Sequence, residues 1–200
     1  MSTIRKICVY CGSGPGNDPA FVEAAQAFGR ILARNGIGLV YGGGNIGLMG
    51  EIANSVLDNR GDVTGIIPQF LTKREIANRR GELIVTRDMH DRKQRMFDLA
   101  DAFVALPGGV GTLEEVVEQM TWAQLGTHKK PILLANINGF WEPLCMLLDH
   151  MTAREFIRPG LSVNYLVADK VEDILPKLQE AARNLTEAEK RMKTADVEKL

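Results

Sequence analysis

The chain has 200 residues, of which 45% are hydrophobic and 24% are charged, and its formal net charge is −1. This length and composition predict one globular domain with a substantial apolar core. A nearly neutral chain has no overall attraction for nucleic acid or for an anionic membrane surface, so we expect neither partner. No apolar run is long enough to span a bilayer, and the first residues lack the apolar segment of a signal peptide. We therefore expect a cytoplasmic protein.

The first predicted strand, residues 7–11, contains Cys8 and Cys11. A C-x-x-C spacing is typical of redox and zinc sites. Alternation along a strand places these two thiols on opposite faces of the sheet, however, and only Cys145 and three scattered histidines remain as further soft ligands. We expect neither a redox pair nor a bound metal. Three cysteines cannot form a disulfide framework, which indicates a reducing compartment.

A glycine-rich segment, residues 42–50, follows a predicted helix at residues 19–34 and a strand at residues 38–41. Its Gly-x-Gly-x-x-Gly string matches a dinucleotide-binding fingerprint, which also requires an acidic residue at the end of the next strand. That strand, residues 63–67, ends in proline and glutamine. The segment therefore predicts contact with a nucleotide or phosphate rather than with NAD. The alternative is that its glycines serve only tight packing of a helix on a strand.

A polar, irregular segment at residues 71–81 precedes the next predicted strand, residues 83–86. Its basic side chains suit either nucleic acid or a solvated flap over a pocket, and the near-zero net charge favours the flap. A helix follows, and Asp88 or Asp91 is suited to cap it. Arg92 then lies in its first turn, beside the carboxyl end of a strand, where ligands bind in open α/β sheets. An exposed surface cation is the alternative interpretation.

The most informative stretch is residues 107–115, which follows an apolar strand at residues 102–106 and leads into a helix. A strand, a glycine loop and a helix N-terminus together present backbone N–H groups and a positive dipole to an anion. We expect Glu114 and Glu115 in the first turn of this helix, where the dipole favours ionisation, so that Glu115 remains a carboxylate. Holding phosphate alone does not require carboxylates there, whereas cleaving a neighbouring bond does.

The last third of the chain continues the alternation of strands and helices. It predicts a strand at residues 132–136, a helix at residues 141–151, a strand at residues 163–167 and a helix at residues 171–183. The expected core face of the first of these helices consists of Leu144, Leu147, Leu148 and Met151. The whole pattern predicts an α/β fold, with a doubly wound, mostly parallel sheet and helices on both faces. Residues 1–183 form the expected domain, and residues 184–200 a charged helical extension.

Three motifs taken together resemble those of the LONELY GUY (LOG) family, the cytokinin riboside 5′-monophosphate phosphoribohydrolases, long mislabelled as lysine decarboxylases. The motifs are PGGVGTLEE at residues 107–115, YGGGNIGLMG at residues 41–50 and DMHDRK at residues 88–93. The resemblance covers about residues 4 to 183. It implies a Rossmann-like domain, no cofactor, and hydrolysis of the N-glycosidic bond of a nucleoside 5′-monophosphate to a free base and ribose 5-phosphate. It also implies a homodimer or larger homo-oligomer with active sites near the interface.

The same resemblance implies a catalytic pair, Arg92 and Glu115. The substrate contacts that it implies are Glu75, Arg92, Lys93, Gly109, Val110, Gly111, Thr112, Leu113, Glu114, Glu115 and Thr121. Helical spacing does not place Thr121 on the face of Glu115, so its inclusion rests on the resemblance alone. Position near the same sheet edge adds four further candidates, Ser13, Gly43, Gly44 and Met89, and Asp88 is a candidate for protonating the leaving base.

Two other functions fit parts of the pattern. One is a nucleotide-binding carrier or regulatory module of the same fold without catalysis, against which the charges of Arg92 and Glu115 argue. The other is a pyridoxal phosphate decarboxylase, for which no lysine has a supporting motif. The preferred base, isopentenyl-adenine or adenine, stays open.

Overall fold

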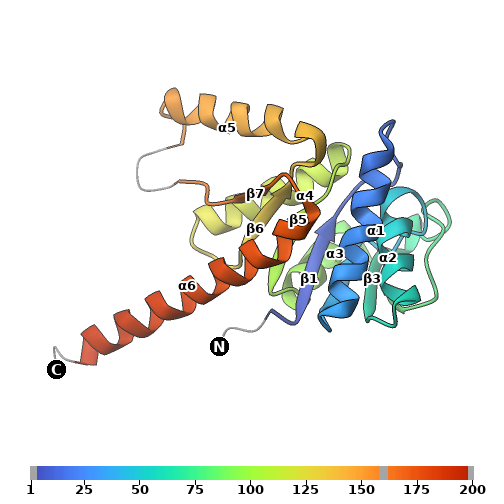
Figure 1. The fold of residues 1–200 in the computed structure, drawn as a ribbon, viewed down its shortest axis with the longest axis horizontal. Helices are drawn as coiled ribbons and strands as arrows, with labels where there is room; N and C mark the ends of the chain where they lie inside the picture. The colour runs from blue at the N-terminus through green and yellow to red at the C-terminus, as the bar shows by residue number, and fades with distance from the viewer. Residues whose placement is uncertain (1–3, 158–161, 198–200) are drawn as a thin grey trace.

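The structure, a computed structural model, describes residues 4–157 and 162–197, with side chains described as far as residue 186. Strands and helices alternate along nearly the whole chain, as the sequence predicts (Figure 1). Their order is β1 (Lys6–Tyr10), α1 (Pro19–Arg34), β2 (Gly38–Tyr41), α2 (Gly47–Asp58), β3 (Val63–Pro68), η1 (Gln69–Leu71), β4 (Glu82–Thr86), α3 (Met89–Leu99), β5 (Ala102–Ala105), α4 (Val110–Gln124), β6 (Ile132–Ala135), η2 (Ile137–Gly139), α5 (Glu142–Ala153), β7 (Leu166–Ala168) and α6 (Val171–Val197).

The strands form one seven-stranded sheet in the order β4-β3-β2-β1-β5-β6-β7, and all neighbouring strands pair in parallel. From β1 the chain first moves outward through β2, β3 and β4, and then returns to the other side of β1 at β5. The doubly wound α/β fold expected from the sequence is therefore confirmed. Loops that follow β1 and β5 diverge at this switch point, where open parallel sheets bind ligands.

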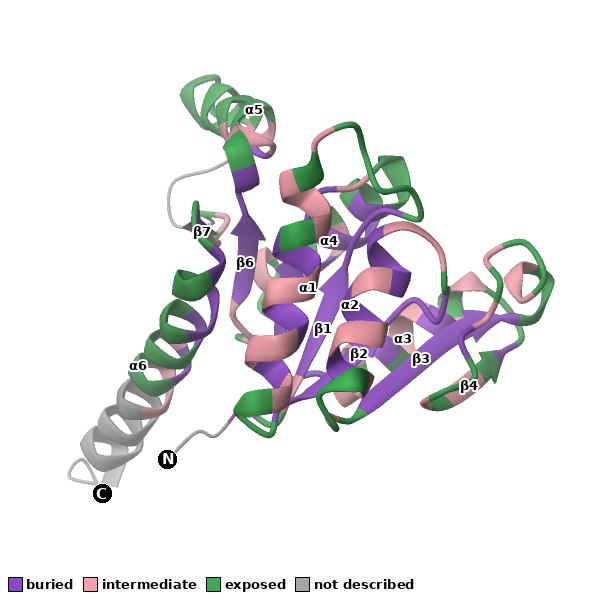
Figure 2. Cartoon of the chain, turned by 45° about the vertical axis from the view of Figure 1, so that its right-hand side comes forward, coloured by how far each residue is buried: buried purple, intermediate pink, exposed green. Residues whose placement is uncertain are grey.

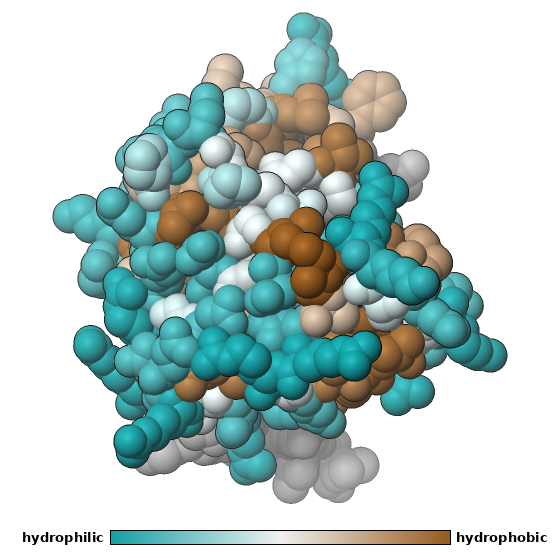
Figure 3. Space-filling model, turned by 90° about the vertical axis from the view of Figure 1, so that its right-hand side faces the viewer, coloured by the Kyte–Doolittle hydropathy of each residue, from teal (hydrophilic) through white to brown (hydrophobic). Residues whose placement is uncertain are grey.

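Helices cover both faces of the sheet. Helices α1, α2 and α6 pack on one face through side chains such as Phe28, Ile52 and Leu178, all fully buried. On the other face α3 and α4 contribute Met96 and Val116 to a second core cluster. Figure 2 shows the central strands as the buried layer between these helices. On the side of the molecule that carries α2 and β3, hydrophilic residues cover most of the surface, and the hydrophobic residues form several separate groups (Figure 3).

The two cysteines of β1 lie in different core clusters, Cys11 on the α1–α2 face and Cys8 on the α3–α4 face. Both thiols are buried and free. The expectation that strand alternation separates them is confirmed. Burial also raises the pKa of each thiol well above its ordinary value, which opposes thiolate chemistry.

Local capping sets the ends of two helices. The Asp18 carboxylate accepts a hydrogen bond from the Ala20 amide at 2.9 Å at the start of α1, and Asn35 ends that helix. The Asp88 carboxylate accepts from the Asp91 amide at 2.8 Å at the start of α3. Of the two capping residues proposed for α3 from the sequence, Asp88 is therefore the one that caps.

One expectation about α4 is wrong. The helix begins at Val110, with Gly109 as its N-cap, so its first turn contains no acidic residue. Residues 110–112 adopt helical conformation directly after the glycine loop, which starts the helix earlier than its apolar pattern indicates. Glu114 and Glu115 consequently lie in the second turn, where the helix dipole acts on them less strongly.

The expected core face of α5 is also wrong in part. Leu147 is 48% exposed and Met151 is 38% exposed, whereas Leu144 and Leu148 are partly buried against the α3–α4 cluster. Figure 2 shows α5 standing away from the sheet and mostly exposed. Helical periodicity marks an apolar face but does not tell whether the same chain covers it.

The last strand and helix also differ from their predicted bounds. Strand β7 pairs with β6 only from Leu166 to Ala168, because residues 163–165 run outside the hydrogen-bonded ladder. Helix α6 continues through the predicted boundary at residue 183 as far as Val197, so the extension is helical to that point, and residues 198–200 lie outside the described part. Within the described residues, every helix is too short or too polar to cross a membrane.

Candidate active site

A cleft of about 260 Å³ lies at the carboxyl edge of the sheet, where the loops after β1 and β5 diverge. Its lining comes from the loops after β1, β2 and β5, from the flap at residues 71–81, and from α3 and α4. The lining residues are Val9, Tyr10, Cys11, Gly12, Ser13, Gly42, Met49, Glu75, Arg92, Gly109, Val110, Gly111, Thr112 and Glu115. Parallel topology thus gathers segments that are far apart in the sequence.

A buried ion pair crosses the cleft wall. The Arg92 Nη1 lies 3.1 Å from Glu115 Oε1, and each side chain is only 10% exposed. The Arg92 Nε donates a hydrogen bond to the Ile66 carbonyl at 3.1 Å, which ties the guanidinium to the end of β3. Because two separate groups hold it, the guanidinium has a fixed orientation, and part of its donor fork remains available to a ligand.

The first glycine of the loop after β2 makes room for this guanidinium. A Cβ atom at Gly42 would overlap the Arg92 Nη2 and lie 3.0 Å from the Met49 sulfur. Any larger residue would therefore move the guanidinium or the loop. The glycine run therefore has a role at the site beyond helix–strand packing, and Gly42 is the glycine that provides it.

Burial raises the pKa of Glu115 to about 7, although the neighbouring Arg92 guanidinium opposes the rise. The negative charge of Glu114 adds to it. The expectation that the helix dipole keeps Glu115 fully ionised is therefore wrong, because desolvation of a buried carboxylate outweighs a dipole that acts mainly on the first turn. Near neutral pH, Glu115 is divided between its carboxylate and its acid.

The N-terminus of α4 supplies a site for an anion at the mouth of the cleft. Its N-cap is Gly109, whose lack of a side chain leaves the first N–H groups without a side-chain acceptor. Val110 and Gly111 are exposed and line the cleft. A Cβ atom at Gly108 would overlap the Thr112 side chain, so this turn closes tightly only with glycine. Positive helix ends of this kind bind phosphate and carboxylate groups.

Eight of the residues expected at the site line the cleft together. They are Ser13, Glu75, Arg92, Gly109, Val110, Gly111, Thr112 and Glu115. These residues come from three different loops and two helices, so the structure brings the two principal motifs and the flap to one place.

Other expected site residues lie outside the lining. The Lys93 Nζ lies 2.5 Å from Glu114 Oε1 and 2.8 Å from Glu118 Oε1, so this lysine links α3 to α4 beside the cleft. Thr121 is exposed, and its hydroxyl donates to the Val117 carbonyl at 2.8 Å. Leu113 is 38% exposed on the outer side of α4.

The remaining three residues expected to contact substrate, Met89, Gly43 and Gly44, also lie outside the cleft lining. Met89 lies with its sulfur 3.9 Å from Arg92 Nη1. Gly43 and Gly44 are buried, and a Cβ atom at Gly44 would lie 3.0 Å from Glu75 Oε2. Substrate contact by Lys93, Leu113, Glu114, Thr121, Gly43, Gly44 and Met89 stays a prediction.

Asp88 is not suited to protonate a leaving group. It caps α3, and the hydrogen bond from the Asp91 amide lowers the pKa of its carboxyl group. A carboxyl group with a lowered pKa is ionised at neutral pH and has no proton to give.

Sequence reasoning missed lining residues such as Tyr10 and Gly12, and it did not single out Gly42 or Met49 within the predicted contact segment at residues 42–50. The signal for Gly12 was available, because it directly follows the strand predicted at residues 7–11, beside the switch point. A second hollow of about 360 Å³ adjoins the cleft across Gly12, Ser13 and Gly109, and its wall includes Phe21, Leu48 and Phe140. Among the described residues, no three His, Cys, Asp or Glu side chains gather as metal ligands.

Comparison with known proteins identifies relatives of this chain. A family profile described as "Possible lysine decarboxylase" matches residues 49–178. A probable cytokinin riboside 5′-monophosphate phosphoribohydrolase of Oryza sativa subsp. japonica is 44% identical over 180 residues, covering 90% of this chain and 81% of the relative. A cytokinin riboside 5′-monophosphate phosphoribohydrolase of Rhodococcoides fascians is 41% identical over 179 residues, covering 88% of this chain and 90% of the relative.

Solved structures share the fold at lower identity. The molybdenum cofactor binding protein of Rippkaea orientalis superposes with a TM-score of 0.65 at 22% identity, covering 89% of this chain and 97% of that one. The Moco carrier protein of Chlamydomonas reinhardtii has a TM-score of 0.67 at 20% identity, covering 91% and 99%. At this identity the likeness shows the fold alone. Identities above 40% over nine-tenths of the chain go further, and the chain belongs to the LOG family of cytokinin riboside 5′-monophosphate phosphoribohydrolases.

Proposed function

We propose that this protein hydrolyses the N-glycosidic bond of nucleoside 5′-monophosphates, cytokinin nucleotides among them, to a free adenine-type base and ribose 5-phosphate. Its relatives in rice, Arabidopsis thaliana and Rhodococcoides fascians carry the name of this activity. The single observation in the structure that supports it best is the buried Arg92–Glu115 pair, which faces a cleft whose mouth is a helix N-terminus. The N-terminus of α4 suits a phosphate, and Glu115 places a carboxyl group in the same cleft.

In the proposed mechanism, the 5′-phosphate binds at the N-terminus of α4, on the backbone around Gly109 and Gly111. Breaking the bond from C1′ to the base leaves positive charge on the ribose, as in other glycosidic cleavages. The carboxylate of Glu115 stabilises this charge and accepts a proton from the attacking water, which adds its hydroxyl to C1′. The base departs with the bonding electrons and takes up one proton, which balances the proton that Glu115 accepts. Arg92 orients that carboxylate and donates from the rest of its fork to the substrate.

The flap supplies a further polar contact in this proposal. Glu75, on the flap, also lines the cleft. Its carboxylate can accept hydrogen bonds from ribose hydroxyls, a use that acidic side chains have in other nucleotide sites. Lys93 acts indirectly, by holding Glu114 and Glu118 away from the cleft.

A matched pair of variants tests the proposal. Glu115→Gln keeps the shape of the side chain and removes its charge, whereas Glu114→Gln makes the same change one residue earlier, on a side chain 51% exposed and paired with Lys93. With AMP and isopentenyladenosine monophosphate as substrates, we expect Glu115→Gln to lower base release by about a hundredfold or more, and Glu114→Gln by less than about threefold. Undiminished release of base by Glu115→Gln would contradict the proposal, and the two substrates decide which base is preferred.

The alternative of a nucleotide carrier without catalysis is separable by the same samples. Its basis is the fold shared with molybdenum cofactor proteins. Tight binding of AMP by the unmodified protein, with no free adenine formed, would favour it. The description of the family profile as a possible lysine decarboxylase has less support, because the described residues that line the cleft include no lysine and Lys93 is paired with two glutamates.

We further propose that the protein is a homodimer, or a larger homo-oligomer, in the cytoplasm. The outer side of α4 carries apolar side chains one or two turns apart that the described chain leaves exposed, and α5 carries more. They are Val110, Leu113 and Val117 on α4, Leu125 at its C-cap, and Met146, Leu147 and Met151 on α5. Met120 on α4 and Trp141, the N-cap of α5, belong to the core instead. Because Val110 also lines the cleft, a partner on this face would lie beside the active site.

A further inference from the structure

The flap at residues 71–81 holds Glu75 in the cleft wall, although the flap itself has little regular structure. It leaves the sheet after β3 and η1 and rejoins it at β4, and most of its side chains are exposed or half-buried. An acidic side chain recognises a ligand only if its position is fixed. The contacts that fix this segment are therefore relevant to binding.

The backbone next to Glu75 is strained. Ile76 has a φ of +50°, in the left-handed region that a β-branched residue rarely adopts, and its side chain is 57% exposed. Packing of the side chain therefore offsets little of the strain. Such a conformation persists only where contacts on both sides determine it.

Those contacts come from the loop after β2. The Asn45 amide donates to the Glu75 carbonyl at 3.1 Å, and the Asn78 amide donates to the Gly43 carbonyl at 2.9 Å. Gly44 and Ala77 form an isolated antiparallel bridge between these two bonds. The loop that supports Arg92 through Gly42 thus also supports Glu75.

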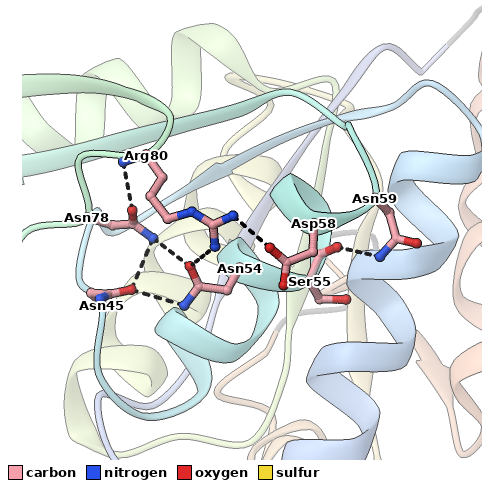
Figure 4. A network of polar contacts seen from close by, with 7 residues as sticks. All are labelled: Asn45, Asn54, Ser55, Asp58, Asn59, Asn78 and Arg80. Atoms are coloured by element: carbon pink, nitrogen blue, oxygen red, sulfur yellow. Dashed lines mark hydrogen bonds and ion pairs between the residues drawn. The ribbon is translucent and has the colours of Figure 1, made fainter.

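A cluster of three asparagines, Asn45, Asn54 and Asn78, joins the flap to this loop and to α2 (Figure 4). Asn78 is 5% exposed, and its Nδ2 donates to Asn45 Oδ1 at 3.1 Å and to Asn54 Oδ1 at 3.4 Å. Its Oδ1 accepts from the Arg80 amide at 3.0 Å, so both ends of its side chain have partners. The Arg80 guanidinium adds a bond to Asn54 at 3.0 Å and an ion pair with Asp58.

Asn45 connects the two halves of this arrangement, because its side chain binds Asn78 while its backbone amide binds Glu75. We infer that Asn78 is a positioning residue, which through Asn45 fixes Glu75 in the cleft and thereby sets the affinity for the nucleotide. The inference rests on the proposed function, in which Glu75 contacts substrate. Asn78 itself is not among the lining residues and acts only through that carboxylate.

A double-mutant cycle tests it, using Asn78→Ala, Glu75→Ala and the double variant, with AMP as the ligand. We expect Asn78→Ala to raise KM about tenfold with kcat changed less than threefold, which matches the loss of one substrate hydrogen bond. In the Glu75→Ala background the same change should have almost no further effect, because the group through which it acts is gone. A role in folding alone would cost the same factor in both backgrounds, and that result would overturn the inference.

Asn59→Ala is the matched control, since the Asn59 Nδ2 donates to the Ser55 carbonyl at 2.8 Å at the end of α2 and, among the described residues, Asn59 forms no hydrogen bond or ion pair with the flap. Its KM should stay within about twofold of the unmodified value. Should Asn78→Ala fail to fold, Asn45→Ser removes one of the two acceptors of Asn78 while keeping the backbone amide that binds Glu75, and a rise in KM is again expected. An unchanged KM in Asn45→Ser would overturn the inference.

The cycle is also measured as the Kd for AMP by calorimetric titration, without turnover. If the unmodified protein released no base, the proposed hydrolysis would fail while the binding cycle still decided the role of Asn78. If base release proceeded normally and the two changes were additive in Kd, only the positioning role would fail.

Discussion

The raised pKa of Glu115 leads to a prediction that separates stability from activity. A carboxyl group whose pKa is higher in the folded than in the unfolded chain binds its proton more tightly when folded. The free energy of unfolding that depends on Glu115 therefore falls as the pH rises between the two values. Glu115→Gln replaces the carboxyl group with a neutral isostere beside the same Arg92 guanidinium, so the variant should lack this pH-dependent loss.

The size of the effect follows from the pKa itself. A rise from 4.5 in a free side chain to about 7 in the cleft, at about 1.4 kcal/mol for each tenfold change in proton affinity, amounts to about 3 kcal/mol. The two proteins should have nearly equal stability below about pH 4.5, where Glu115 is protonated in both states. By about pH 8 the Glu115→Gln variant should be the more stable by about 2 to 3 kcal/mol, although it has lost base release.

Urea denaturation at about pH 5 and at about pH 8 measures this difference, with each variant compared with the unmodified protein at the same pH. Subtraction at equal pH removes the contribution of every other titrating group. Glu114→Gln is the control, because its side chain is half exposed and its stability difference should not depend on pH in this way. If the advantage of Glu115→Gln were the same at both pH values, or reversed at the higher one, the argument from burial would be refuted.

Three further outcomes follow from the same geometry. If the carboxylate of Glu115 is the active form, kcat/KM should fall about tenfold per pH unit below about pH 7 and be level above it, whereas a loss above pH 7 would show that the acid form acts. Gly42→Ala should lower kcat/KM by about tenfold or more, since its Cβ displaces the guanidinium paired with Glu115. At Gly14 an added Cβ meets nothing within 4 Å, so Gly14→Ala should keep the kcat/KM of the unmodified protein, and equal kcat/KM values for the two variants would contradict the packing argument. Leu125 is 74% exposed at the C-cap of α4, and Leu125→Glu should shift the mass measured by light scattering toward that of the monomer. Phe70→Glu, at a position 64% exposed beside the flap, should leave the mass unchanged, and an unchanged mass in both variants would count against this face as the interface.

The fold could be predicted from the sequence because its determinants are local and repeated. Alternation of short apolar runs with amphipathic helices allows few arrangements besides a parallel sheet covered on both faces. Once the sheet is parallel, the loops after its strands gather on one edge, which is why Ser13, Arg92 and Thr112 could be grouped before any coordinates. Helix bounds were less accessible, as α4 shows, because residues 110–112 lack a helical pattern of their own.

The electrostatic state of the site could not be predicted in the same way. The sequence places Glu115 near a helix start, but its pKa depends on how much water reaches it, which only the packed structure defines. The same limit applies to Gly42, which is indistinguishable from Gly43 and Gly44 until the position of the Arg92 guanidinium is known. A run of glycines therefore predicts a close approach without telling which glycine provides it.

The fold and the chemistry of this protein have separate physical origins. A parallel sheet with a glycine loop at its switch point supplies an anion site by topology, and structures at 20–22% identity, named as molybdenum cofactor binding and carrier proteins, share the fold. Nothing in that frame requires a carboxyl group and a guanidinium to be buried against each other, an arrangement that costs desolvation energy. A protein whose site only held phosphate would have a larger free energy of unfolding without Glu115, as we predict above for Glu115→Gln at about pH 8. An acid buried 3.1 Å from a fixed arginine, on the helix that the glycine turn starts, is the physical argument that this cleft does more than bind.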